Sequence, residues 1–135
     1  MAVLSGKCLC GEISYETDAE PAVVANCHCT DCRAATGAAY ATLMFVPRDK
    51  VTIRGETKTF THASESGSTM TKHFCPTCGS PMFTENTARE GVLGLRGGNV
   101  EQTDKVKPMR NVFLSSKIPS TPLDPDLPGD QKMPG

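Results

Sequence analysis

The residues best suited to chemistry are seven cysteines, which fall in three close groups. The groups are Cys8-Leu9-Cys10, then Cys27-His28-Cys29 with Cys32 three positions later, and Cys75-Pro76-Thr77-Cys78. Groups of two, three and two ligands divide into one closed site with four thiolates and one site with three. A closed tetrahedral Cys₄ zinc site is structural, whereas zinc with three protein ligands keeps an open position for chemistry. The pattern therefore predicts a small zinc enzyme whose reactive centre is the middle group.

The two outer pairs have the spacing of a structural metal site. Cys75 and Cys78 form a Cys-x-x-Cys loop that ends in a glycine, and Cys8 and Cys10 alternate on an extended segment, so that both point the same way. One metal on these four ligands would close a loop of 65 positions and stabilise the fold strongly. Ordinary buried thiols, or iron in a rubredoxin-like site, are the alternatives.

The middle group predicts a site with an open position. Cys27 and Cys29 share one face of an extended segment, and Cys32 returns after a short turn. His28 should point away from the sulfurs, as a packed or exposed histidine rather than a fourth ligand. His62 and His73 are more distant candidates for a fourth ligand. A second structural zinc, completed by a histidine or another group, is the alternative to a reactive centre.

Charge narrows the chemistry of the middle group. Three thiolates around Zn²⁺ leave a net charge of −1, which makes the metal a weaker Lewis acid than one held by neutral imidazoles. Such a site favours an incoming thiolate over a hydroxide, and this points to formation or cleavage of a carbon–sulfur bond. Arg33 and Lys72 are candidate contacts for an anionic thiol substrate, and surface ion pairs are their alternative role.

The elements that must position these cysteines are expected to be short strands. The chain has 135 residues with 12 Gly and 10 Pro, which favours one mainly β domain: a small, zinc-stapled, complex β fold of short antiparallel sheets. Thr30 or Asp31 is expected to cap a short helix that ends at Gly37. The domain is predicted over residues 1–118, followed by a Pro-rich tail, 119–135, that packs loosely or is disordered.

Charge and hydropathy exclude several classes of partner. The net charge of −1, without long runs of one sign, argues against a nucleic-acid partner, and no segment is apolar enough to span a membrane. The first residues lack the pattern of a signal peptide, and an odd number of cysteines argues against a disulfide framework. We therefore expect a cytoplasmic protein with reduced thiols, with a homodimer as a further expectation.

Three motifs together resemble one known family. They are Gly6-Lys7-Cys8-Leu9-Cys10-Gly11, Cys27-His28-Cys29-x-x-Cys32-Arg33 and Phe74-Cys75-x-x-Cys78-Gly79-Ser80. In this order they resemble the glutathione-dependent formaldehyde-activating enzymes, whose domain the centromere protein V group shares. The resemblance implies a fold like that of the small zinc-containing Rab exchange factor or chaperone. It implies two zinc ions per chain, a structural one on Cys8, Cys10, Cys75 and Cys78 and a catalytic one on Cys27, Cys29 and Cys32.

The activity that this resemblance implies is a carbon–sulfur lyase, or synthase, that adds glutathione as co-substrate to formaldehyde and gives S-(hydroxymethyl)glutathione. The expected partners are thus a small-molecule thiol and an aldehyde. The chain departs from the family in having Lys72 where Arg is frequent, and in lacking a tryptophan after the segment Asn111–Lys117. The alternatives are a non-catalytic zinc domain that serves as a protein-binding or chaperone module, and a thiol-based sensor.

Overall fold

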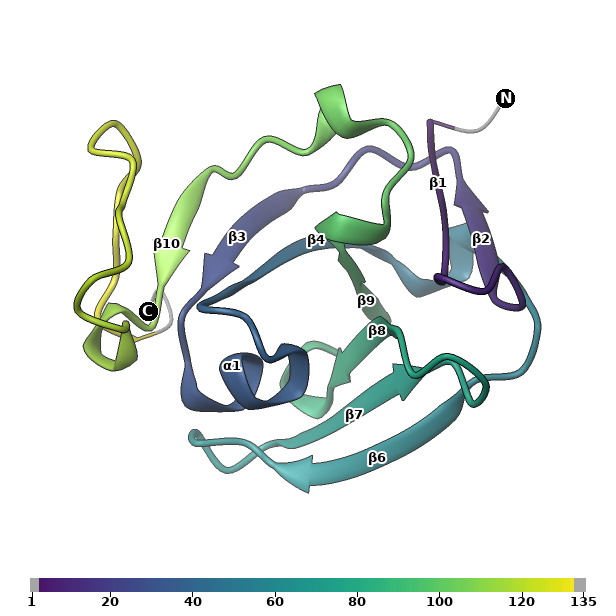
Figure 1. The fold of residues 1–135 in the computed structure, drawn as a ribbon, viewed down its shortest axis with the longest axis horizontal. Coiled ribbons are helices and arrows are strands. Elements are labelled where there is room, and N and C mark those ends of the chain that lie inside the picture. The colour runs from purple at the N-terminus through teal and green to yellow at the C-terminus, as the bar shows by residue number, and fades with distance from the viewer. Residues whose placement is uncertain (1–2, 133–135) are drawn as a thin grey trace.

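Residues 3–132, the part of the chain that the computed structural model describes, form ten β-strands and one α-helix (Figure 1). The strands are β1 (Leu4–Lys7), β2 (Ser14–Thr17), β3 (Val23–Cys27), β4 (Ala41–Pro47), β5 (Val51–Arg54), β6 (Lys58–Ala63), β7 (Thr69–Phe74), β8 (Pro81–Asn86), β9 (Val92–Arg96) and β10 (Arg110–Val112). The helix is α1 (Thr30–Thr36), and short 3-10 turns lie at Arg48–Lys50, Thr87–Arg89, Gly97–Asn99, Thr103–Lys105 and Leu114–Ser116. The predicted mainly β architecture is confirmed.

The strands build two sheets. The smaller sheet is antiparallel and has the order β1-β2-β5, and the larger one has seven strands in the order β10-β3-β4-β9-β8-β7-β6. All neighbours in the larger sheet are antiparallel except β10, which runs parallel to β3. In Figure 1 the smaller sheet stands at one end of the molecule, and α1 lies over the face of the larger sheet between β4 and β7.

The two faces of the larger sheet bury different sets of residues. Alternate side chains of β4 point to opposite faces, as strand geometry requires. Met44 and Val46 join the larger apolar core, which also contains Tyr15 of the smaller sheet. Ala41 and Leu43 belong to a second, smaller core together with sulfurs of the middle cysteine group. The sheet therefore separates the main stabilising core from the side on which the three-cysteine group lies.

Helix α1 begins within the middle cysteine group. Cys29 is the N-cap residue, and its Sγ accepts a hydrogen bond from the backbone N–H of Cys32 at 3.2 Å. The prediction that Thr30 or Asp31 caps the helix is therefore wrong, because sulfur takes the place of the usual cap oxygen. The predicted end is confirmed: Gly37 has φ 72°, a left-handed conformation that glycine adopts without strain.

The ends of the chain differ most from expectation. The first strand, Leu4–Lys7, was not predicted, because its four residues show no clear alternation of apolar and polar types. The tail is not loose up to residue 132, because it returns beside β10 (Figure 1). Asn111 N–H donates to the Pro128 carbonyl at 3.0 Å, Asp130 N–H donates to the Asn111 carbonyl at 2.9 Å, and Asp130 pairs with Arg110 at 3.0 Å. β10 is an edge strand of the larger sheet, so its outer backbone groups can form these hydrogen bonds with the tail. Residues 133–135 lie outside the described part.

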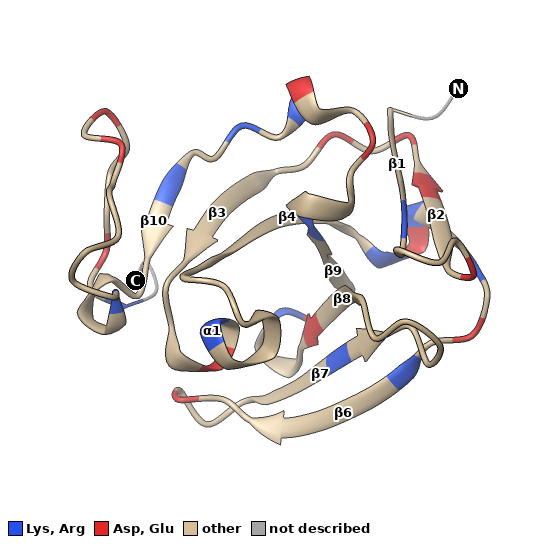
Figure 2. Cartoon of the chain, in the orientation of Figure 1, with Lys and Arg blue, Asp and Glu red and all other residues tan. Residues whose placement is uncertain are grey.

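Acidic and basic residues are interspersed along the ribbon, without a large region of one sign (Figure 2). The helix in the described range is too short and too polar to cross a membrane.

Close packing around Gly6 in β1 predicts a strong effect of Gly6→Ala. A Cβ at Gly6 would lie 2.5 Å from Cε1 of Tyr15 in the neighbouring strand β2 and 2.6 Å from the Asn99 carbonyl oxygen in the 3-10 turn Gly97–Asn99, so the backbone must shift. We expect the free energy of unfolding, measured in urea, to fall by about 1–3 kcal/mol. Gly98→Ala is the matched control, because its added Cβ meets nothing within 4 Å. Equal stability of the two variants would contradict this account of the packing at Gly6.

Candidate metal centres

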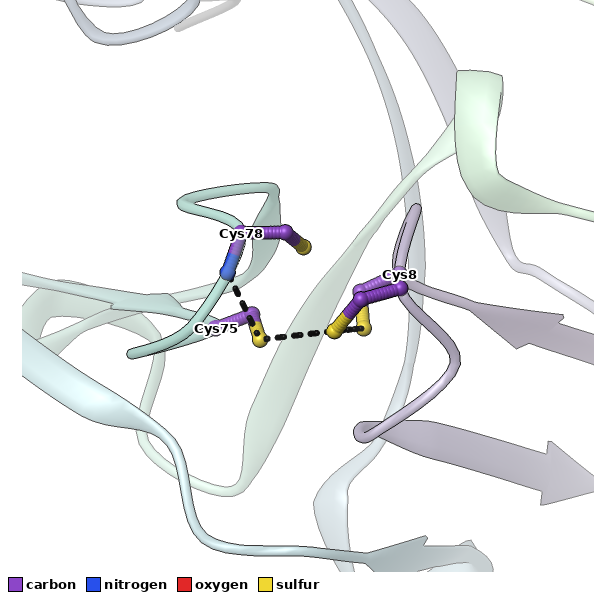
Figure 3. Close-up of side chains that lie close together, drawn as sticks. Cys8, Cys75 and Cys78 are labelled. Carbon is purple, nitrogen blue, oxygen red and sulfur yellow. Dashed lines mark hydrogen bonds between the residues drawn. The ribbon is translucent and has the colours of Figure 1, made fainter.

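The outer cysteine pairs converge between the two sheets. Cys8 and Cys10 lie in the loop between β1 and β2, and Cys75 and Cys78 lie in the loop between β7 and β8. All four sulfurs lie within 4.8 Å of one another, with Cys8 to Cys10 at 3.6 Å and Cys10 to Cys75 at 3.7 Å. Figure 3 shows Cys75 and Cys78 facing Cys8 from the opposite loop. Four sulfurs at about 2.3 Å from a tetrahedral zinc would be about 3.8 Å apart, so the group fits such an ion.

Backbone amides of both loops stabilise negative charge on these sulfurs. Ile13 N–H donates to Cys8 Sγ at 3.2 Å, and Cys78 N–H donates to Cys75 Sγ at 3.5 Å. Hydrogen bonds from the hydroxyl and the backbone N–H of Ser80 lower the pKa of Cys78 to about 5. These donors favour the thiolate form, which is the form that binds a metal. The sequence analysis used Ser80 only as part of a family motif, and its contact with Cys78 appears only in the fold.

The middle group brings three sulfurs within 4.8 Å of one another. Cys27 ends β3, Cys29 caps α1, and Cys32 lies in the first turn of that helix. Cys27 and Cys32 are buried, and Cys29 is half-buried. A strand that passes directly into a helix thus turns three nearby cysteines toward one point. No histidine or carboxylate of the described residues joins this group, so it offers a metal three protein ligands.

The three thiols of the middle group cannot all ionise without a cation. Hydrogen bonds from Cys27 and Cys32 lower the pKa of Cys29 to about 2. The hydrogen bond to Cys29, followed by that to Cys32 and by burial, raises the pKa of Cys27 far above its ordinary value. Hydrogen bonding within the trio therefore favours the thiolate at Cys29 and opposes it at Cys27. A soft divalent ion would bind all three as thiolates and retain an open coordination position.

The three histidines take other partners. His28 is fully buried, its Nε2 lies 3.0 Å from Asn111 Oδ1, and its ring packs on Tyr40 at 4.9 Å. This confirms that it packs away from the neighbouring sulfurs. His73 Nε2 lies 2.6 Å from a Glu85 carboxylate oxygen, and His62 stacks on Phe60.

Arg96 is a site residue that the sequence analysis missed. It ends β9 opposite Leu43 of β4, and only 5% of its surface is exposed. Two of its guanidinium nitrogens, Nε and Nη1, have no hydrogen-bond partner within residues 3–132. Burial lowers the pKa of Arg96, and the nearby sulfurs of the middle group raise it in opposition. A buried guanidinium requires a counter-charge, which the cysteine trio supplies. The only sequence signal was a charged residue directly after the apolar run Val92–Leu95.

A cavity of about 850 Å³ opens beside the three-cysteine group. The three sulfur-bearing residues form part of its wall, and Lys72 lines it from β7. The positive charge of Lys72 favours the thiolate forms of Cys29 and Cys32. Arg33, the other predicted substrate contact, lies in α1 and is not among the residues that line the cavity. The fold thus brings Lys72 to the cysteine trio and leaves Arg33 outside the cavity wall.

Two comparisons with known proteins bear on this site. A sequence profile described as "Glutathione-dependent formaldehyde-activating enzyme" matches residues 3–116. The fold is similar to a crystal structure of a Rhodobacter sphaeroides protein, with a TM-score of 0.59 and 20% sequence identity. That similarity covers 77% of this chain and 96% of the other one. At 20% sequence identity, this similarity shows that the two chains share a fold.

The outer group predicts a metal that contributes to stability. Cys75→Ser should lower the metal content by one ion per chain, and it should lower the free energy of unfolding by about 2–5 kcal/mol, the range for losing a native cross-link. Native mass spectrometry and urea unfolding measure the two effects. Cys29→Ser is the matched control: it also removes one ion, but its group spans only residues 27–32, so less chain is constrained. Equal loss of stability in the two variants would contradict a stapling role for the outer group.

The position of Arg96 predicts that it supports metal binding by the trio. Arg96→Met should weaken the affinity of the middle group for Co²⁺ about tenfold, because the trio loses its buried counter-charge. Titration followed by the sulfur-to-cobalt absorption band measures this affinity, and Arg96→Lys should retain most of it. Arg54→Met, which removes an exposed ion pair with Glu16 in the smaller sheet, serves as the control. Superimposable titrations of Arg96→Met and the unmodified protein would exclude this role.

Proposed function

Because the chain belongs to the glutathione-dependent formaldehyde-activating enzyme family, we propose that it is a zinc-dependent carbon–sulfur lyase acting in the synthetic direction. It adds a thiol such as glutathione to formaldehyde or a related small aldehyde. The observation that carries this proposal is the three-sulfur group on the wall of a cavity of about 850 Å³. Three protein ligands would leave a bound metal one position for a substrate, and the three cysteines line a cavity that has room for one.

The donor set supports zinc at both groups. Sulfur ligands of this number and spacing suit Zn²⁺, which would supply Lewis acidity and lower the pKa of an incoming thiol. Cys8, Cys10, Cys75 and Cys78 would hold the structural ion, and Cys27, Cys29 and Cys32 would hold the second one. Free thiols of this kind persist in a reducing compartment, and we assign the protein to the cytoplasm.

The chain's own residues bind and orient the reactants. The substrate sulfur forms a bond with the aldehyde carbon, the carbonyl electron pair moves to oxygen, and that oxygen takes the proton released by the thiol. Lys72 Nζ, which lies near Cys29 and Cys32, donates a hydrogen bond to the oxygen as negative charge develops on it. Arg96 keeps the buried trio close to electroneutral, and the apolar wall around Leu43 limits access of water.

Small-molecule chemistry accounts for the cavity better than a protein-binding role does. The three most exposed large apolar side chains among the described residues are Leu9, Phe60 and Met109. They lie in the loop after β1, on β6, and just before β10, so they belong to separate parts of the fold. The cavity instead collects apolar and charged groups around the cysteine trio, as expected of a small-molecule site.

The proposal predicts different effects for two variants. Cys27→Ser should abolish formation of S-(hydroxymethyl)glutathione, followed by NMR with isotope-labelled formaldehyde, and should remove the second metal ion. Lys72→Met should retain both ions and lower kcat about 100-fold, because a charge-stabilising group is lost. Lys105→Met, at an exposed position away from the cavity, is the control for the loss of a lysine. Full turnover by Cys27→Ser would refute the proposed function.

A further inference from the structure

The acidic and basic side chains that line the cavity differ in whether they have a partner of opposite charge. Its three carboxylates each have a basic partner: Asp31 faces His62, Glu65 contacts Lys132, and Glu85 contacts His73. Among its cations, Arg110 pairs with Asp130. Lys72 and Arg89 have no carboxylate within ion-pair distance among residues 3–132. Each carboxylate of the cavity therefore has a basic neighbour, whereas Lys72 and Arg89 have no carboxylate partner among these residues.

Arg89 lies at a distance from the cysteine trio. Its guanidinium lies over the Phe45 ring at 5.7 Å from the ring centroid. The strand register gives the separation of Phe45 from the trio, because Cys27 pairs with Ala41 and Phe45 lies four residues further along the same strand. Four residues of an extended strand span about 13 Å. A ligand that reaches both the trio and Arg89 must therefore be long.

The surface between these two ends is apolar. Ala25 pairs with Leu43 across β3 and β4, and both line the cavity together with Phe45 and with Val112 of β10. A small aldehyde with a compact polar thiol would leave much of this surface uncovered. Burial of an apolar segment of the ligand here would contribute about 25 cal/mol to the free energy of binding for each Å² of apolar surface removed from water.

We propose that the thiol substrate of this enzyme is amphipathic: its sulfur binds at the cysteine trio, an apolar segment covers Ala25, Leu43 and Phe45, and an anionic end binds Arg89. This inference rests on the proposed function, because it assigns the substrate sulfur to the open position of the trio. Arg89 is then a specificity-determining residue beside Phe45, which lies about 13 Å along β4 from the residue paired with Cys27. Its guanidinium offers a planar pair of donors that matches a carboxylate.

Two probes of the same shape and different charge test this assignment. Isothermal titration of the zinc-loaded full chain compares omega-mercapto-octanoate with its neutral isostere, omega-mercapto-octanamide. We expect the carboxylate to bind about tenfold more tightly than the amide, since only the carboxylate forms a hydrogen bond between charged groups with Arg89. Arg89→Met should abolish this preference, and Arg89→Lys should restore part of it. Lys105→Met removes one exposed charge outside the cavity and should keep the preference in full.

The outcomes separate this inference from the proposed function. Equal binding of the two probes, failure of the carboxylate to bind, or an unchanged preference in Arg89→Met would overturn the inference. Formation of S-(hydroxymethyl)glutathione is measured on the same protein. Product without a preference for the carboxylate would refute only the amphipathic substrate. A preference that depends on Arg89, with no product from any thiol and formaldehyde, would refute the proposed reaction and retain the ligand class.

Discussion

The structure depends on the close approach of sulfur atoms from distant parts of the chain. Cys10 and Cys75 are separated by 65 positions, yet their sulfurs lie 3.7 Å apart. Each sheet contains strands of only a few residues, and such strands are weak without a cross-link or a broad apolar core. Thiolates at this spacing repel one another unless a cation lies between them. A metal ion bound at the outer group would therefore link the folding of the smaller sheet to that of the larger one.

The seven-stranded sheet separates the larger apolar core from the cavity and the middle cysteine group. One face carries the larger core, which contains Met44, Tyr15 and the buried sulfurs of Cys8 and Cys75. The other face carries the cavity and the middle cysteine group, which is packed against a smaller set of apolar residues. Because successive side chains of one strand alternate between faces, a single strand such as β4 contributes to both. The reactive group can thus keep an open position without exposing the main core to water.

Charge balance determines what the cavity can bind. The thiolates of the trio concentrate negative charge at a buried position. Arg96 is buried beside them and forms no ion pair with a carboxylate among the described residues. Isolated buried charges are costly, so these groups stabilise each other. Away from the trio, the carboxylates of the cavity have basic neighbours, whereas Arg89 has no carboxylate partner among the described residues. The site therefore has one end that could hold a metal and another that can attract an anion, with an apolar surface between them.

The sequence by itself determined the division of the cysteines into groups of four and three, the mainly β architecture and the helix end at Gly37. These features depend on local spacing, alternation and backbone conformation, which are visible in a single chain. It did not reveal the strand at Leu4–Lys7 or the return of the tail to β10, because both are held by partners distant in sequence. Arg96 and Arg89 were missed for the same reason: neither has a motif. Only the tertiary structure could show which charges lie beside the sulfurs, because burial and pairing depend on how the strands are ordered in the sheet.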